Sequence, residues 1–182
     1  MNPAGGTDAS EAERADGRNG HGDSAPPGYL LALEPIMRLA LAEASATGGS
    51  VAADDVPVGA VVVAPSGEVL GRGRNRCVAD SDPTAHAEVV ALRQAARAAG
   101  TWRLDGCTLV VTLEPCTMCA GALIAARIQR LVYGAADPRA GAAGSLWDVV
   151  RDRRLGQPVE VIGGVLADSG ARLVSEFFER LR

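Results

Sequence analysis

Asp-Pro-Thr-Ala-His-Ala-Glu at residues 82–88 decides the fold and the chemistry, together with Pro-Cys-Thr-Met-Cys at residues 115–119. The two stretches provide one imidazole, two thiols and one further carboxylate. A hydrolytic zinc site needs this set, because three protein ligands leave the fourth position of the metal open for water. The sequence therefore predicts His86, Cys116 and Cys119 as zinc ligands, with Glu88 beside them.

The spacing of the two cysteines supports a shared metal. Pro115 is suited to opening a helix, so we expect a helix over about 116–127. Cys116 and Cys119 then lie one turn apart on one face, where a single ion can bind both sulfurs. The positive end of the helix dipole also lowers thiol pKa values and favours the thiolates that zinc requires.

Glu88 lies two residues after His86, which on a helix would turn it about 200° away from the histidine. It is therefore poorly placed as a fellow ligand. A carboxylate that reaches the open metal position from the side can instead carry protons between water and a leaving group. We predict that Glu88 is the catalytic general acid and base.

Three other interpretations of the cysteine pair remain open: a structural zinc site, a redox-active dithiol and two thiols buried in the core. A structural zinc site would need a fourth protein ligand, for which Cys77 and Cys107 are candidates, although Cys107 begins a predicted strand and should lie some 20–30 Å away. A redox-active dithiol also places C-x-x-C between a strand and a helix. It leaves His86 and Glu88 unexplained, so catalytic zinc is the favoured interpretation.

Composition predicts one globular domain and a tail. The chain has 182 residues and 47% hydrophobic content, enough for one sizeable core. Residues 1–28 hold almost no large apolar side chain, so we expect a disordered N-terminal tail there and a folded domain at 29–182.

The net charge of the chain does not show whether its partner is a nucleic acid. The net charge is −4 and all 18 basic residues are arginine, so phosphate binding would need a local arginine patch. Arg151-Asp152-Arg153-Arg154 is either such a patch or a solvated face. Four cysteines, with no secretory leader and no run of about 18 apolar residues, indicate a cytoplasmic protein that does not cross a membrane.

Hydrophobic periodicity and turn residues predict an α/β fold, namely a three-layer α/β/α sandwich on a five-stranded mixed sheet. Thr84 is the expected N-cap of the second helix, and the order of elements around Cys116 predicts a parallel strand pair. The expected helices are 34–46, 85–99, 116–127, a short one near 146–151 and one from about 167; the expected strands are 58–64, 68–74, 107–113, 130–135 and 159–162.

The pattern H-x-E…P-C-x-x-C resembles the zinc nucleobase deaminases, and within them the bacterial tRNA-specific adenosine deaminases. The resemblance covers roughly residues 34–180. Besides the metal motifs, it is carried by Val56–Val61, Asn75-Arg76, Thr112–Cys116, Cys119–Ala122, Gly141–Leu146 and Phe177-Phe178.

The resemblance implies a cytidine deaminase-like fold, one Zn²⁺ per subunit, a homodimer and hydrolytic deamination of the wobble adenosine to inosine in a tRNA anticodon stem-loop. It implies that Asn75, the backbone of Ala87 and Asp137 bind the substrate. The loop 137–145 would face nucleic acid, and the C-terminal helix with Phe177-Phe178 would help to grip it. For Glu114 we expect a structural role, bonding local backbone N–H groups.

Two alternative functions remain. A free-base or nucleoside deaminase, such as a guanine or cytosine deaminase, would share every metal residue. A zinc-retaining RNA-binding module without turnover is the second, and the presence of Glu88 argues against it.

Overall fold

The computed structural model describes residues 28–46, 55–156 and 158–182. Within these ranges the chain forms one five-stranded mixed sheet in the order β2-β1-β3-β4-β5. The strands are β1 Gly59–Val63, β2 Val69–Arg74, β3 Thr108–Leu113, β4 Arg130–Ala135 and β5 Glu160–Ile162; the helices are α1 Gly28–Ser45, α2 Ala87–Ala99, α3 Thr117–Ala125, the 3₁₀ turn η2 Arg153–Leu155 and α4 Ala167–Arg180. The predicted fold class is confirmed.

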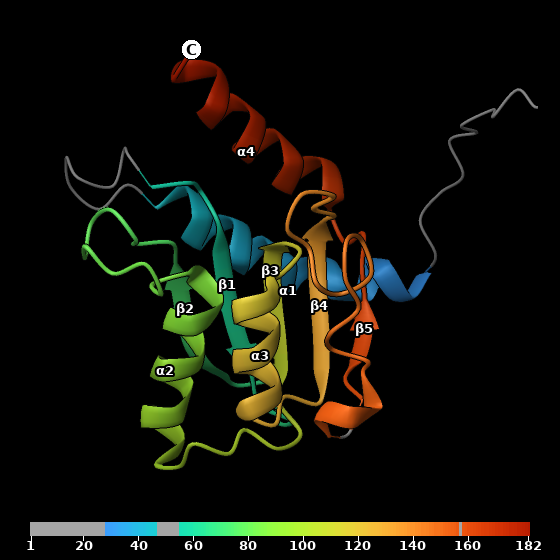
Figure 1. Cartoon of the computed structure of the whole chain (residues 1–182). Helices are drawn as coiled ribbons and strands as arrows, with labels where there is room; N and C mark the ends of the chain where they lie inside the picture. The colour runs from blue at the N-terminus through green and yellow to red at the C-terminus, as the bar shows by residue number, and fades with distance from the viewer. Residues whose placement is uncertain (1–27, 47–54, 157) are drawn as a thin grey trace, which may run out of the picture.

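Helices cover both faces of the sheet, with α2 and α3 on one face and α1 on the other (Figure 1). Side chains alternate between the two faces of a strand, so each central strand feeds two cores. Val62 and Val111 pack in the core under α2 and α3, whereas their neighbours Val61 and Val110 pack in the core that includes Met37 of α1. This explains why the central strands are apolar throughout.

The directions of the strands determine which strand ends meet at the edge of the sheet that carries the site. β1 pairs antiparallel with β2 and β3, while β3, β4 and β5 are parallel to one another. The helix α3 connects β3 to β4, as predicted for a parallel pair. The carboxyl ends of β3 and β4 therefore lie side by side, with Leu113 paired to Ala135.

Two glycines bring α2 close to the sheet. A β-carbon on Gly71 would collide with the carbonyl oxygen of Ala91, and one on Gly73 with that of Ala87. Only glycine permits this approach of helix backbone to strand backbone. The start of α2, which carries the first sequence motif, is thereby held against the end of β2.

The boundaries of three predicted helices were wrong. The helix α1 begins at Gly28 and not at 34, so Pro35 lies inside it. The additional first turns carry Leu30 and Leu33, which pack against the core that includes Met37. The burial of these side chains outweighs the loss of the backbone hydrogen bond that proline cannot donate. The helix α2 begins at Ala87, with His86 and not Thr84 as N-cap. Likewise α3 runs over Thr117–Ala125, shorter than 116–127.

No helix forms at 146–151. The amides of Leu146 and Trp147 bond to the carbonyl of Gly141, and that of Val149 to Ala142. These bonds fold the segment back on the preceding loop and leave none for a helix. Of the tail predicted at 1–28, residues 1–27 lie outside the described residues, and Gly28 already belongs to α1.

In the described ranges, none of the helices combines the length and apolarity needed to span a bilayer.

Candidate metal and catalytic site

His86 and Cys116 occupy equivalent positions at the starts of α2 and α3. Each is the N-cap residue of its helix, with extended backbone, and neither uses its side chain to cap. An N-cap side chain ordinarily accepts a hydrogen bond from its own helix. Here the two side chains are free to meet between the helices, and Cys119 joins them from the first turn of α3.

The three side chains fit a zinc ion. The Nδ1 atom of His86 lies 3.7 Å from Sγ of Cys116 and 3.5 Å from Sγ of Cys119. Tetrahedral zinc with ordinary bond lengths separates nitrogen and sulfur ligands by about 3.6 Å. All three ligand atoms lie within 4.8 Å of one another. Cys77 and Cys107 are not in this group, so the described residues supply three donors and no fourth.

Electrostatics favours a thiolate at this point. The Cys119 thiol and His86 hydrogen-bond to Cys116 and lower the pKa of the Cys116 thiol to about 3. The hydrogen bond to Cys116 and burial raise the pKa of Cys119. The Cys116 thiolate in turn raises the pKa of His86. A negative charge is thus stabilised between two helix N-termini, where a cation can bind it.

Glu88 lies beside this cluster and is only 3% exposed. It lines a pocket with His86 and Cys116, and its carboxyl and the Cys119 thiol are close enough to affect each other's pKa. Burial raises the pKa of Glu88, and its own backbone amide offsets only part of this effect. A carboxyl that holds a proton more readily than usual is suited to general acid and base catalysis.

The pocket has a volume of about 210 Å³. Typical pockets for drug-sized ligands have about 300–1,000 Å³, so this one suits a single planar base. It is lined by Val56, Val58, Asn75, His86, Ala87, Glu88, Leu113, Glu114, Cys116, Asp137 and Ala140.

Asn75 presents an unsatisfied acceptor at this pocket. Its Nδ2 donates to the carbonyl oxygen of Val56 at 3.2 Å, and a carbonyl cannot face the amide oxygen, so the orientation of the side chain is fixed. The Oδ1 atom is buried and has no hydrogen-bond partner among the residues that the structure describes. Buried polar atoms are nearly always hydrogen-bonded, which makes this oxygen a candidate contact for a bound ligand.

Ala87 and Asp137 are the other two residues predicted to bind the substrate, and they differ in whether their polar groups already have partners. Ala87 is the first residue of α2, where backbone N–H groups have no partner within the helix, and it lines the pocket. Asp137 also lines the pocket, but its Oδ1 accepts from the amides of Arg139 and Ala140 at 2.9 and 3.3 Å. Its carboxylate therefore already shapes its own turn.

Glu114 binds the loop over the site, as expected of a structural residue. Its carboxylate accepts from the amides of Asp137, Ala143 and Ser145 at 2.9–3.0 Å, and also from the Ser145 hydroxyl. Burial opposes ionisation, yet the hydrogen bonds from Ser145 and the loop amides hold the pKa of Glu114 below its usual value. A β-carbon on Gly141 would collide with this carboxylate, so the loop packs directly on it.

Two residues support the site in ways that the sequence did not predict: Asp55, and Arg151, which was considered only as part of the segment 151–154. The buried carboxylate of Asp55 accepts from the amides of Val78 and Ala79 at 2.7 and 3.1 Å. It thereby ties the segment before the first motif to Val56 at the pocket. Arg151 donates to Asp148 and to the carbonyl of Ala143, which braces the loop from the other side. An isolated Asp or Arg gives no sequence signal for such contacts.

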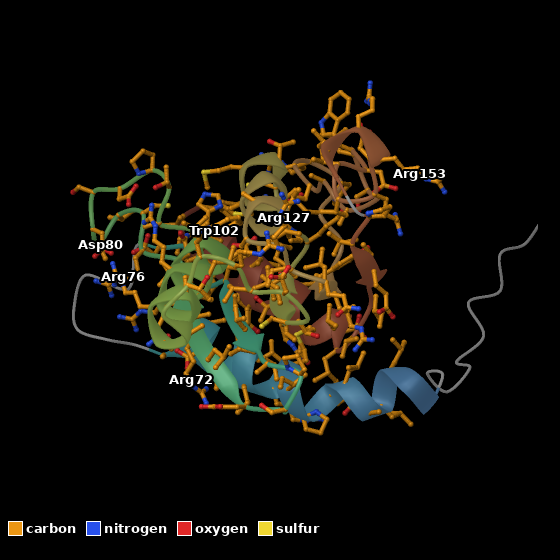
Figure 2. All side chains as sticks on the ribbon, turned by 90° about the horizontal axis from the view of Figure 1, so that it is seen from below. Arg72, Arg76, Asp80, Trp102, Arg127 and Arg153 are labelled. Atoms are coloured by element: carbon orange, nitrogen blue, oxygen red, sulfur yellow. The ribbon has the colours of Figure 1, made fainter. Side chains whose placement is uncertain are left out.

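Arginines are spread around the molecule, as the labelled Arg72, Arg127 and Arg153 in Figure 2 show. Many are paired locally: Arg72 with Glu43, and Arg154 with Asp152, for example. In the segment 151–154, expected to be either a phosphate patch or a solvated face, Arg154 pairs with Asp152 and Arg151 with Asp148 just before the segment. Two of its three arginines are therefore neutralised by neighbouring aspartates.

A three-donor metal cluster with a buried carboxyl, at the carboxyl edge of an α/β/α sheet, defines a metal-dependent hydrolase. Residues 32–135 match the family described as "Cytidine and deoxycytidylate deaminase zinc-binding region", and the chain belongs to this family. The predicted zinc cofactor is confirmed by this match and by the fit of the donor cluster.

Two named relatives are similar to this chain over most of its length. The tRNA-specific adenosine deaminase of Haemophilus influenzae is 45% identical over 149 residues, which cover 82% of this chain and 84% of that protein. A protein of Deinococcus deserti named tRNA(Ile)-lysidine synthase is 52% identical over 130 residues, 71% of this chain. The chain spans only 24% of the length of that protein.

Two solved structures have a fold similar to that of this chain. A structure from a study of A-to-I editing by tRNA:A34 deaminases superposes with a TM-score of 0.71 at 43% identity, covering 76% of this chain and 98% of that one. A guanine deaminase from Nitrosomonas europaea gives a TM-score of 0.60 at 28% identity, covering 85% of each chain. The resemblance to tRNA deaminases found in the sequence is therefore confirmed.

Proposed function

We propose that this protein hydrolytically deaminates the wobble adenosine of a tRNA anticodon loop to inosine. The chemistry rests on one observation, the convergence of His86, Cys116, Cys119 and Glu88 on a base-sized pocket. The substrate rests on the similarity to tRNA-specific adenosine deaminases over most of both chains.

In this proposal, the imidazole of His86 and the thiolates of Cys116 and Cys119 hold one zinc ion. Bound zinc supplies a Lewis acid that activates water at neutral pH. Glu88 takes a proton from the attacking water, delivers it to N1 of the base, and transfers the second proton to the departing amine. Water and adenosine are thus converted to inosine and ammonia. The raised pKa of the buried Glu88 suits both directions of transfer.

We assign recognition of the base to Asn75, Ala87 and Asp137. The free Oδ1 of Asn75 accepts a hydrogen bond from the substrate, which satisfies the buried oxygen. The N–H of Ala87 donates from the start of α2. Asp137 acts at the rim, where its turn positions the loop 137–145 against the neighbouring nucleotide. Extruding an adenosine from a loop breaks little base pairing, which favours this substrate.

The remaining assignments concern the whole protein. We propose residues 29–182 as the deaminase domain and a cytoplasmic homodimer as the active form. The helix α3 favours close pairing, because a β-carbon on its exposed Gly121 would touch nothing within 4 Å. A small flat surface of this kind allows another chain to approach closely. Light scattering on the purified protein measures the assembly directly.

The decisive experiment compares substrates on one preparation. Purified protein is incubated with an anticodon stem-loop carrying adenosine at the wobble position, and separately with free adenosine, guanine and cytosine, and its zinc content is measured. We expect inosine only in the RNA and about one zinc per chain. Turnover of a free base without activity on RNA would overturn the tRNA assignment and leave the zinc assignment intact.

Guanine deamination is the second candidate, favoured by the similarity to the Nitrosomonas europaea enzyme. It would use the same metal residues and Glu88. The guanine reaction in the same experiment tests it, since ammonia release from guanine at a rate comparable to that from RNA would support it.

A further inference from the structure

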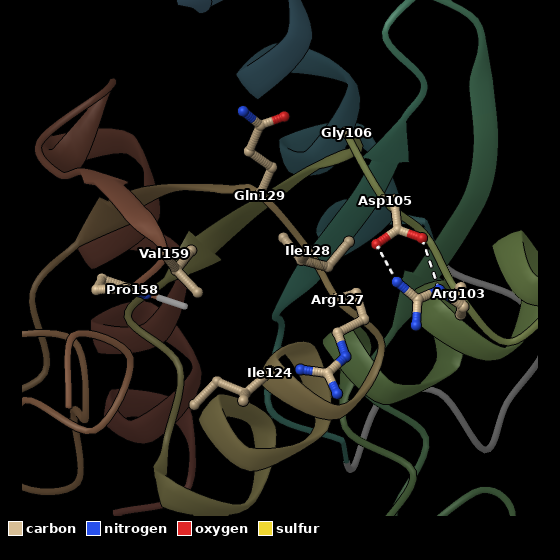
Figure 3. Close-up of a pocket in the computed structure, with 9 residues that line it drawn as sticks. All are labelled: Arg103, Asp105, Gly106, Ile124, Arg127, Ile128, Gln129, Pro158 and Val159. Atoms are coloured by element: carbon tan, nitrogen blue, oxygen red, sulfur yellow. Dashed lines mark hydrogen bonds and ion pairs between the residues drawn. The ribbon is translucent and has the colours of Figure 1, made fainter. Parts of the chain in front are cut away.

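A second pocket, of about 520 Å³, lies at the opposite edge of the sheet, where β3, β4 and β5 begin (Figure 3). β3 has six residues, so this edge is about 20 Å from the catalytic pocket. Its walls are Arg103, Asp105, Gly106, Ile124, Arg127, Ile128, Gln129, Pro158 and Val159. Nothing in the proposed deamination uses these residues.

The pocket carries an uncompensated positive charge. Asp105 accepts from Nε and Nη2 of Arg103 at 2.9 and 3.1 Å, so this acid is matched by one arginine. Arg127 makes no ion pair or side-chain hydrogen bond with any residue that the structure describes. Figure 3 shows the guanidinium groups of Arg103 and Arg127 on one side of the pocket and Pro158 and Val159 on the other.

The backbone of Arg127 is also unusual. It follows the C-cap residue of α3 with a φ of 65°, the left-handed conformation that glycine ordinarily supplies at this position. Its amide bonds to the carbonyl of Ile124, and that of Ile128 to Leu123, so the turn is a regular helix end. A glycine would close this helix without strain. An arginine held in a strained conformation at a pocket indicates a use for its side chain.

We propose that this pocket is an accessory anion site that binds a phosphate group. Guanidinium groups match phosphate oxygens through paired N–H donors, and Gln129 also lines the pocket. The apolar side chains of Pro158 and Val159 form the opposite wall (Figure 3). The phosphate belongs either to a nucleic acid backbone or to a free phosphate compound.

The test uses Arg127→Gly in the full-length protein. Glycine suits the left-handed conformation, so this variant should fold at least as stably as the parent while it lacks the charge. Arg97→Ala is the matched control, because it removes one exposed charge from the end of α2 and Arg97 does not line the pocket. Thermal melting is measured with and without inorganic phosphate, and binding of the anticodon stem-loop is measured across a salt series.

If free phosphate is a ligand, it raises the melting temperature of the parent and of Arg97→Ala, and the rise disappears in Arg127→Gly. If RNA is the ligand, Arg127→Gly weakens RNA binding and reduces the salt dependence by about one counterion, beyond any effect of Arg97→Ala. Equal behaviour of the two variants in both arms overturns the proposal.

Two other outcomes also overturn it. If Arg127→Gly melts at a lower temperature and its melting temperature still rises with phosphate, the role of the arginine is to stabilise the negative, C-terminal end of the α3 dipole. If the variant changes the oligomeric state, the pocket is a subunit contact.

Discussion

Two buried glutamates stand 26 positions apart at the same edge of the sheet and differ in almost every other respect. Both side chains are almost inaccessible to solvent, at 3% and 2% exposed, but Glu88 lies deeper in the protein than Glu114. Burial raises the pKa of Glu88, whereas the pKa of Glu114 is lowered. Shallower burial and hydrogen bonds make the difference together, because Glu114 accepts from three backbone amides and a hydroxyl.

The comparison separates the carboxyl that we propose as reactive from a structural one. A buried carboxylate surrounded by donors stays charged and holds its neighbours in place. A buried carboxyl with few donors can exchange a proton at little cost, which is what proton transfer requires. The same substitution at the two positions should therefore have opposite consequences.

The largest effect is expected for Glu88→Gln. The amide keeps the shape of the side chain and cannot carry protons, so deamination of the RNA substrate should fall by about 10²–10⁴-fold. Zinc content should remain near that of the parent, and thermal stability should be unchanged or higher, because a buried carboxyl is replaced by a neutral group. Initial rates, zinc analysis and melting on one preparation test this. If Glu88→Gln deaminates the RNA as fast as the parent, Glu88 does not carry the protons in the reaction.

Glu114→Gln should show the reverse pattern. Its amide nitrogen would face the Asp137 amide, donor against donor, and the remaining bonds would lose the charge of the acceptor. We expect a loss of about 2–3 kcal/mol in the free energy of unfolding. Denaturant unfolding measures it, with Glu88→Gln as the isosteric control. If Glu114→Gln is as stable as the parent, the loop does not depend on this carboxylate.

Sequence alone could predict the metal donors because they stand at element boundaries with strong local signals. His86 precedes an alanine-rich helix and Cys116 follows Pro115 at the end of a strand, so the topology itself brings them together. The strand predictions succeeded for a similar reason: the apolar run of β4 at 130–135 matches the structure at both ends.

Tertiary contacts decided what the sequence could not show. The composition of the segment 146–151 favours a helix, but amides of this segment donate hydrogen bonds to the carbonyls of Gly141 and Ala142. The open oxygen of Asn75 depends on a hydrogen bond to Val56, 19 residues away. Such bonds between distant segments leave no periodic trace in the sequence.

Gly141 offers an independent way to sharpen the comparison. Alanine there would press on the Glu114 carboxylate and the carbonyl of Asp137, so we expect a cost of about 2 kcal/mol in stability. A double-mutant cycle with Glu114→Ala isolates the contact, since removing the carboxylate should relieve part of the clash. Additive costs would show that the backbone of Asp137, and not Glu114, sets the requirement for glycine.

Ser145→Ala removes one of the four donors to Glu114 and leaves the three backbone amides in place. The hydroxyl contributes a bond to a charged acceptor, but Ser145 is exposed and its backbone amide continues to donate at 3.0 Å. We expect a loss of about 1 kcal/mol, smaller than that of Glu114→Gln, with deamination close to that of the parent. Ser175→Ala on α4 is the control, because its hydroxyl bonds only to carbonyls of its own helix and should cost almost nothing. A loss equal to that of Glu114→Gln would mean that the hydroxyl, and not the three amides, keeps Glu114 charged, and the distinction between the two glutamates would then depend on one serine.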